Sequence, residues 1–133
     1  MQAAEVYAKL STAKRLQVGC VIVKNNTIIG IGYNGTPSGW DNDCEYADYY
    51  DDGNFKIKTK PEVLHSETNA IAKVARSTNS TEDADMFITH APCLECAKLI
   101  YQSGIRKVFY RDTYRSEEGL NFLHQCNVEV NRV

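Results

Sequence analysis

The chain has 133 residues, of which 43% are hydrophobic and 24% charged, and its formal net charge is −2. This length and composition are typical of one globular domain, so we expect a single domain over residues 1–133. The charge balance excludes the broadly basic surface that grips a long nucleic acid, but it allows a small charged ligand held by a few local groups.

The start of the chain predicts a helix over residues 2–11, because its apolar residues recur at helical spacing. This helix carries Glu5, which a signal peptide would not. No apolar run approaches the ~18 residues that a membrane helix needs. We therefore expect a cytoplasmic protein, in the cytoplasm of the host if the chain is viral.

Two short β-branched runs flank Asn25 and Asn26, which suit a tight turn, and this pattern predicts a β-hairpin over residues 18–33. Residues 34–61 are rich in glycine, proline, aspartate and asparagine. We expect them to form one long irregular segment, and loops of this length inside a compact domain are usually functional or disordered.

The rest of the chain alternates helix and strand. The expected helices are 63–76, 93–103 and 116–126, and the expected strands are 86–90, 107–111 and 128–132. Gly104 is suited to end the second of these helices. Helix–strand alternation implies parallel strands joined by right-handed crossovers. We therefore expect an α/β fold in which helices cover both faces of a mixed five-stranded sheet.

The segment HSETNA begins at His65 and places Glu67 two residues later. Alone, these two residues could be ordinary polar groups in an exposed first turn of a helix. The segment APCLECAK adds Cys93 and Cys96, a spacing that can point both sulfurs at one metal ion from the start of a helix. One imidazole and two thiolates form the nitrogen and sulfur ligand set that zinc prefers.

Three protein ligands are typical of a catalytic zinc, because the fourth position is left to water. Zinc lowers the pKa of such a water to about 7, and the water still needs a partner that moves protons. Glu67 is close enough to His65 in the sequence to face the fourth position without filling it.

Other interpretations of the cysteines remain open. The pair Cys93–Cys96 could be a redox pair, although this leaves His65 and Glu67 without a role. A structural zinc would need a fourth ligand, for which the candidates are His90, Cys44 and His124. The odd number of cysteines, five, argues against a disulfide framework, and Cys20 and Cys126 are expected to be core residues.

The pattern H-x-E followed by P-C-x-x-C is the signature of the zinc-dependent nucleobase deaminases. Residues 18–44, 61–71 and 92–110 further resemble the deoxycytidylate (dCMP) deaminases, and GYNGTPSG, which begins at Gly32, is the stretch that separates them from their relatives. Free cytidine deaminases usually have cysteine where His65 stands. The short chain is more typical of viral or bacterial members.

The resemblance implies a cytidine-deaminase-like three-layer sandwich that converts dCMP to dUMP and ammonia, supplying the precursor of dTMP. It implies that zinc is held by His65, Cys93 and Cys96 and that Glu67 is the proton shuttle. The residues expected to contact the substrate are Asn34 at the deoxyribose, Ser66, Pro92, and, at the 5′-phosphate, Tyr114 and Arg115. The last two follow the strand 107–111 at its C-terminal end, where open α/β sheets bind ligands, although they could be an ordinary loop pair.

Dependence on effectors is a further implication of the resemblance. Relatives are commonly hexamers that dCTP activates and dTTP inhibits, and a regulatory triphosphate commonly carries Mg²⁺. The residues that match the regulatory site are Gly35, Thr36, Asn69 and Arg76. Arg76 could instead be a solvated cation at the C-terminus of a helix, which is a favourable place for it.

Two other functional classes remain. A deaminase of polynucleotides, such as tRNA or single-stranded DNA, would flip a base into the same pocket, but the acidic balance argues against it. A non-catalytic nucleotide-binding module stabilised by zinc is the other class. Such a module would have no use for the carboxylate of Glu67.

Overall fold

The computed structural model describes residues 1–133, and its centre is a mixed five-stranded sheet of order β2-β1-β5-β6-β7. The sheet strands are β1 (Gly19–Lys24), β2 (Thr27–Tyr33), β5 (Asp85–His90), β6 (Lys107–Asp112) and β7 (Glu129–Arg132). The helices are α1 (Gln2–Ala8), α2 (Ser66–Ala75), α3 (Leu94–Gln102) and α4 (Glu118–Gln125). β1 is antiparallel to β2 and β5, whereas β5, β6 and β7 are parallel, as the helix–strand alternation predicts.

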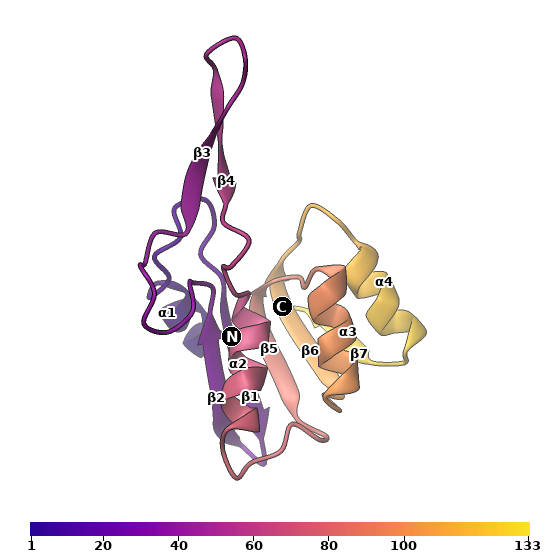
Figure 1. Cartoon of the computed structure of the whole chain (residues 1–133). Coiled ribbons are helices and arrows are strands. Elements are labelled where there is room, and N and C mark those ends of the chain that lie inside the picture. The colour runs from indigo at the N-terminus through magenta and orange to yellow at the C-terminus, as the bar shows by residue number, and fades with distance from the viewer.

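Helices cover both faces of this sheet, so the expected fold class is confirmed (Figure 1). The inner residues of β1 and β5, such as Cys20 and Met86, form one buried cluster with residues of α2, α3 and α4. α1 packs on the other face, where Gly19 brings β1 against the backbone of Ala4 and Ala8. No helix of the structure has the length and the apolar character needed to cross a membrane.

The hairpin of β1 and β2 follows the prediction closely. Asn25 and Asn26 both have positive φ, 51° and 60°, which is the geometry of a two-residue hairpin turn that matches the twist of the strands. The pairing runs from Gly19 opposite Tyr33 to Lys24 opposite Thr27, with one irregularity next to Ile22.

The prediction of one irregular segment over residues 34–61 is wrong. β3 (Glu45–Tyr49) and β4 (Phe55–Thr59) form an antiparallel hairpin that stands away from the main sheet (Figure 1). Gly53 takes φ +87° in the turn, and the rings of Tyr49 and Phe55 pack with their centroids 5.4 Å apart. The two strands have the sequences EYADY and FKIKT, but the polar composition of residues 34–61 as a whole obscured both.

The expected helices form but begin or end a few residues inside their predicted limits. Residues 63–65 stay extended before α2, because Leu64 pairs with Gly35 through two backbone hydrogen bonds of 2.7 and 3.1 Å. The end of α3 is confirmed, since Gly104 takes φ +83° just beyond Gln102. Ala70 and Val74 of α2 are buried, whereas Ala75 is exposed.

Candidate active site

Two helix N-termini meet at the carboxyl edge of the parallel strands. His65 and Cys93 are the N-cap residues of α2 and α3, with extended backbones (ψ 156° and 170°). Neither side chain caps its own helix, so the imidazole and the thiol remain available for another partner. Cys96 lies in the first turn of α3. The partial positive charge at helix N-termini favours the thiolate form that binds metals.

The three side chains form one compact cluster. The Nδ1 atom of His65 lies 3.5 Å from Sγ of Cys93 and 3.3 Å from Sγ of Cys96, and all the candidate ligand atoms lie within 4.8 Å of one another. Tetrahedral zinc with bonds of about 2.0 Å to nitrogen and about 2.3 Å to sulfur holds these atoms about 3.5 Å apart. The cluster therefore fits zinc, with His65 presenting Nδ1.

No fourth protein ligand joins the cluster. Cys44, His90 and His124, the candidates for a fourth ligand of a structural zinc, all lie outside it. Cys44 is buried, and its Sγ lies 3.4 Å from the hydroxyl of Thr12. A zinc ion held by this cluster would keep one position for water, which is the arrangement of catalytic sites.

The two thiols differ in acidity. Hydrogen bonds from Cys96 and His65 lower the pKa of Cys93 to about 4. The same contact with Cys93, together with burial, raises the pKa of Cys96 well above its ordinary value. A metal ion binds the thiolate form of cysteine, so metal binding at this pair releases protons.

Glu67 lies in the first turn of α2 and is only 4% exposed. Burial raises the pKa of its carboxyl above the ordinary value, while the hydroxyl of Ser66 donates a 2.8 Å hydrogen bond to Oε2 and opposes this rise. A carboxyl group with a raised pKa takes up a proton more readily than an ordinary carboxylate and can release it again. This is the property that a proton shuttle needs.

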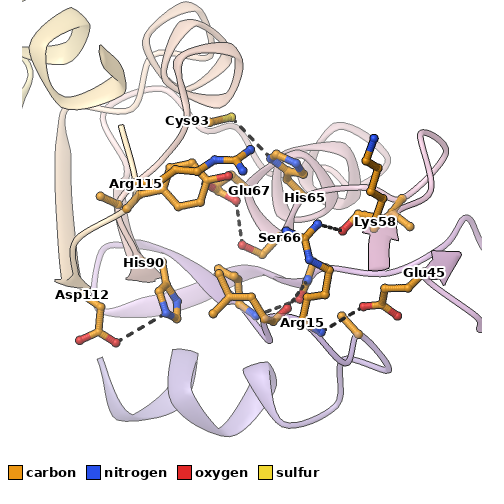
Figure 2. A pocket seen from close by; sticks show the side chains of 18 of the residues that line it. Arg15, Glu45, Lys58, His65, Ser66, Glu67, His90, Cys93, Asp112 and Arg115 are labelled. Carbon is orange, nitrogen blue, oxygen red and sulfur yellow. Dashed lines mark hydrogen bonds and ion pairs between the residues drawn. The ribbon is translucent and has the colours of Figure 1, made fainter. Parts of the chain in front are cut away.

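These groups open into a cavity of about 900 Å³, shown in Figure 2. Its lining joins the start of α2 with the ends of β5 and β6 and the base of the β3–β4 hairpin. The lining residues with the chemistry discussed here are Arg15, Asn34, Glu45, Lys56, Lys58, His65, Ser66, Glu67, His90, Cys93, Asp112, Tyr114 and Arg115.

The structure brings most of the predicted substrate residues to this cavity. Ser66, Tyr114 and Arg115 line it, and Arg115 lies over the ring of Tyr114 at 5.5 Å. Asn34 lines it too, but its amide accepts from the N–H of Val18 (2.9 Å) and donates to the carbonyl of Leu16 (2.8 Å). Pro92 is fully buried outside the lining.

The four residues that the sequence resemblance assigned to a regulatory site, Gly35, Thr36, Asn69 and Arg76, do not line this cavity. Asn69 donates to the carbonyl of Tyr33 at 2.9 Å, next to the strand end that leads to Gly35 and Thr36. Arg76 is the exposed C-cap of α2, about 10 Å further along the helix axis from Asn69. Three of the four residues are thus close together, and Arg76 lies apart from them.

Several lining residues had no motif to reveal them. Arg15, Lys56 and Lys58 bring positive charge to the cavity, and Glu45 and Asp112 bring negative charge. They come from segments far apart in the sequence. Only a prediction of how the β3–β4 hairpin packs against the 11–17 loop would have found most of them.

His90 also lines the cavity, at the end of β5. Its Nδ1 lies 3.0 Å from the hydroxyl of Thr89, and its Nε2 lies 3.6 Å from a carboxylate oxygen of Asp112. Burial lowers the pKa of His90, an effect that Asp112 opposes and Arg111 reinforces. His90 is therefore a largely neutral member of the cavity wall near pH 7.

Comparison with known families decides how this site is classified. Residues 1–112 match the sequence model described as the cytidine and deoxycytidylate deaminase zinc-binding region. The chain belongs to this family. Its His–Cys–Cys cluster lies within the matched region, which agrees with the zinc-binding description.

Similar proteins include two deoxycytidylate deaminases. That of Enterobacteria phage T4 is 32% identical over 167 residues, covering 98% of this chain and 86% of the phage protein. That of Homo sapiens is 37% identical over 121 residues, covering 89% of this chain and 66% of the human protein. The dCMP deaminase of cyanophage S-TIM5, solved in complex with dCMP and dUMP, superposes with a TM-score of 0.89 at 43% identity, covering 99% of this chain and 92% of that chain.

Proposed function

We propose that this protein catalyses the hydrolytic deamination of dCMP to dUMP and ammonia, with residues 1–133 acting as one zinc-dependent domain. The observation that carries the proposal is the buried carboxyl of Glu67 beside the cluster of His65, Cys93 and Cys96. The relatives named deoxycytidylate deaminase, and a similar phage enzyme solved with dCMP and dUMP, support this choice of substrate.

A zinc ion on these three ligands would lower the pKa of a water to about 7 and so supply the nucleophile. Glu67 accepts a proton from the attacking water and passes it to N3 of the cytosine ring while the oxygen bonds to C4. Glu67 then takes the remaining proton from the new hydroxyl at C4 and delivers it to the exocyclic nitrogen. The C4–N bond breaks, ammonia leaves, and the oxygen stays as the C4 carbonyl of dUMP. One carboxyl must act as base and then as acid, which suits its raised pKa.

The 5′-phosphate needs hydrogen-bond donors and positive charge, which the hydroxyl of Tyr114 and the guanidinium of Arg115 would supply. Both line the cavity that holds Glu67. Arg15 approaches from another wall, where its guanidinium donates to the hydroxyl of Thr59 at 3.2 Å. Planar guanidinium groups match phosphate oxygens well, which favours arginine in this role.

The proposal extends to pathway and regulation. The product dUMP would serve as the precursor of dTMP in the cytoplasm, with activation by dCTP, which carries Mg²⁺, and inhibition by dTTP. Gly35, Thr36 and Asn69 lie together outside the catalytic cavity, which supports a second nucleotide site there. Arg76 lies apart from these three residues, at the C-terminal end of α2, so it would approach that site from a different side.

Assembly into a homo-hexamer is the last part of the proposal. The side chains of Trp40, Tyr49 and Phe55 are 60%, 70% and 56% exposed, on and near the projecting hairpin. Exposed apolar patches of this kind mark interaction sites, which supports self-association.

Ammonia release from dCMP, cytidine, dCTP and an adenosine-bearing tRNA stem-loop tests the proposal, each with and without dCTP and dTTP as effectors. We expect turnover of dCMP, raised by dCTP and lowered by dTTP. Turnover without an effector response would remove the regulatory part and keep the chemistry. No release from any substrate by zinc-loaded protein would contradict the enzymatic assignment.

A further inference from the structure

Glu45 carries an acceptor that the protein itself does not use. It is the first residue of β3, it is only 6% exposed, and it lines the catalytic cavity. Its Oε1 accepts hydrogen bonds from the backbone N–H groups of Lys14 (2.7 Å) and Arg15 (3.2 Å). Its Oε2 is the one buried side-chain oxygen or nitrogen without a hydrogen-bond partner.

An orphaned carboxylate oxygen is costly, because desolvation of the charge is not repaid by a donor. Native structures keep such groups rarely, and mostly where a ligand or an ordered water completes them. Oε2 is covered in this structure, but Glu45 is part of the cavity wall, so a small rotation of its carboxylate would let a molecule that fills the cavity supply the missing donor.

Asn34 provides a contrast on the same wall. Like Glu45, its side chain forms hydrogen bonds with the backbone of residues 14–18, here with the N–H of Val18 and the carbonyl of Leu16. Both polar atoms of its amide thus already have a protein partner. Of these two residues, only Glu45 presents an acceptor atom with no partner at all.

The chemistry of the ligand identifies the donor. This step rests on the proposed function, in which the cytosine amine lies beside Glu67 and the 5′-phosphate beside Arg115. A carboxylate repels phosphate and accepts from a hydroxyl. The sugar of a 2′-deoxynucleoside 5′-monophosphate has one hydroxyl, at its 3′ carbon.

We propose that Glu45 accepts a hydrogen bond from the 3′-hydroxyl of the substrate and thereby selects free mononucleotides over nucleotides whose 3′ oxygen is esterified. A 3′-phosphate removes the donor and brings a second negative charge towards the carboxylate. The protein thus distinguishes a mononucleotide from a residue inside a polynucleotide by one contact at the base of the hairpin.

The test measures kcat/KM of zinc-loaded protein for dCMP, 2′,3′-dideoxycytidine 5′-monophosphate and deoxycytidine 3′,5′-bisphosphate. A hydrogen bond between a hydroxyl and a charged group changes affinity about 10- to 100-fold, so the wild type should prefer dCMP to the dideoxy compound by about that factor. The bisphosphate should be a poorer substrate still.

Glu45→Gln keeps an oxygen for Lys14 and Arg15 and removes the charge. We expect this variant to lose dCMP activity and keep dideoxy activity, so that the preference falls at least about fivefold, while the bisphosphate improves relative to dCMP. Tyr46→Phe, at the next position of β3 and on its other face, should keep the wild-type preference. Equal thermal unfolding and zinc content would show that both variants fold.

Three results would overturn the inference. Equal turnover of dCMP and the dideoxy compound by the wild type would show that the protein does not recognise the 3′-hydroxyl. This comparison needs no variant. An equal loss of kcat/KM for dCMP and the dideoxy compound in Glu45→Gln would show that Glu45 acts only by supporting the backbone of Lys14 and Arg15. No turnover of any of the three compounds by the wild type would instead contradict the proposed function itself, and the inference with it.

Discussion

At the scale of single residues, the site contains two kinds of residue. Some belong to a short sequence motif, and others reach the site only because the fold brings distant segments together. His65 and Glu67 are two positions apart, and Cys93 and Cys96 are three apart, so a short sequence pattern could predict all four. They lie at the N-caps and in the first turns of two helices, where the backbone fixes their relative position.

Arg15 and Glu45 could not be predicted in this way. Arg15 reaches the cavity because the loop that carries it is tied to Glu45 and Thr59 of the β3–β4 hairpin. Thirty residues separate Arg15 from Glu45, and no local periodicity encodes a contact between a loop and a hairpin that was itself expected to be irregular.

Arg115 gives a prediction for the phosphate site. Arg115→Ala should lower kcat/KM for dCMP about 10- to 100-fold, since a charge-assisted hydrogen bond to phosphate is lost. The same variant should lose little with deoxycytidine, which has no phosphate to bind. Steady-state kinetics with both substrates check this.

Arg106→Ala is the matched control for Arg115, because Arg106 is exposed and pairs with Asp85 at 3.2 Å outside the cavity. This control should leave both substrates unchanged. Equal losses with dCMP and deoxycytidine in Arg115→Ala would contradict the phosphate assignment.

His90 gives a prediction about pH. Burial lowers its pKa in the folded protein, whereas the unfolded chain has the ordinary value of about 6.5. Between these two pKa values the unfolded chain binds more protons, so the free energy of unfolding must fall as the pH drops below about 6.5. His90→Gln removes this contribution and should flatten the fall.

Urea denaturation of the zinc-loaded wild type and His90→Gln at about pH 7, 6 and 5 measures the effect. Zinc stays in excess, so that loss of metal does not add a second pH dependence. Parallel stability curves for the two proteins would show that His90 has the same pKa in the folded and unfolded states.

At the scale of elements, Gly32 controls how α2 lies on the sheet. A Cβ at Gly32 would overlap the carbonyl oxygen of Ser66 and approach the N atom of Ala70 to 2.7 Å. Both contacts are backbone atoms in the helix that positions Glu67, so a side chain can be admitted only if the helix moves.

Gly32→Ala should therefore destabilise the fold by about 1–3 kcal/mol and lower kcat, because the start of α2 shifts relative to α3. Ile28→Ala on the same strand is a control at a half-exposed side chain (50%) and should change stability much less. Denaturant unfolding together with dCMP turnover checks both variants. Wild-type stability and activity in Gly32→Ala would contradict this packing.

The elements also show which sequence signals are reliable. The helices and the sheet strands were predicted because their apolar residues repeat with a clear period and are bounded by residues such as Asn25, Asn26 and Gly104. β3 and β4 were missed because they lie in a segment dominated by aspartate, asparagine and glycine, although Phe55 and Ile57 alternate with lysines in β4.

At the scale of the whole molecule, metal and fold are expected to be coupled. The cluster joins α2 and α3, two helices from separate parts of the chain, and a ligand that binds only the folded state stabilises it by mass action. Chelation should lower the unfolding temperature. If free zinc had been present at 100 times its Kd, its removal lowers the free energy of unfolding by about 2.7 kcal/mol.

Differential scanning calorimetry before and after chelation, and after zinc is restored, measures this coupling. Cys93→Ser should bind zinc weakly and show a much smaller shift between the two conditions, since the thiolate ligand is lost. If the wild type unfolds at the same temperature with and without zinc, metal binding does not stabilise the fold.

The most direct test of the account compares the wild type with Glu67→Gln for conversion of dCMP to dUMP, at equal zinc content measured by metal analysis. The isosteric amide keeps the shape of the site and cannot carry the proton, so we expect kcat to fall about 10²- to 10⁴-fold while zinc stays at one per chain. Undiminished conversion by zinc-loaded Glu67→Gln would contradict the central claim that this carboxyl moves the protons of the reaction.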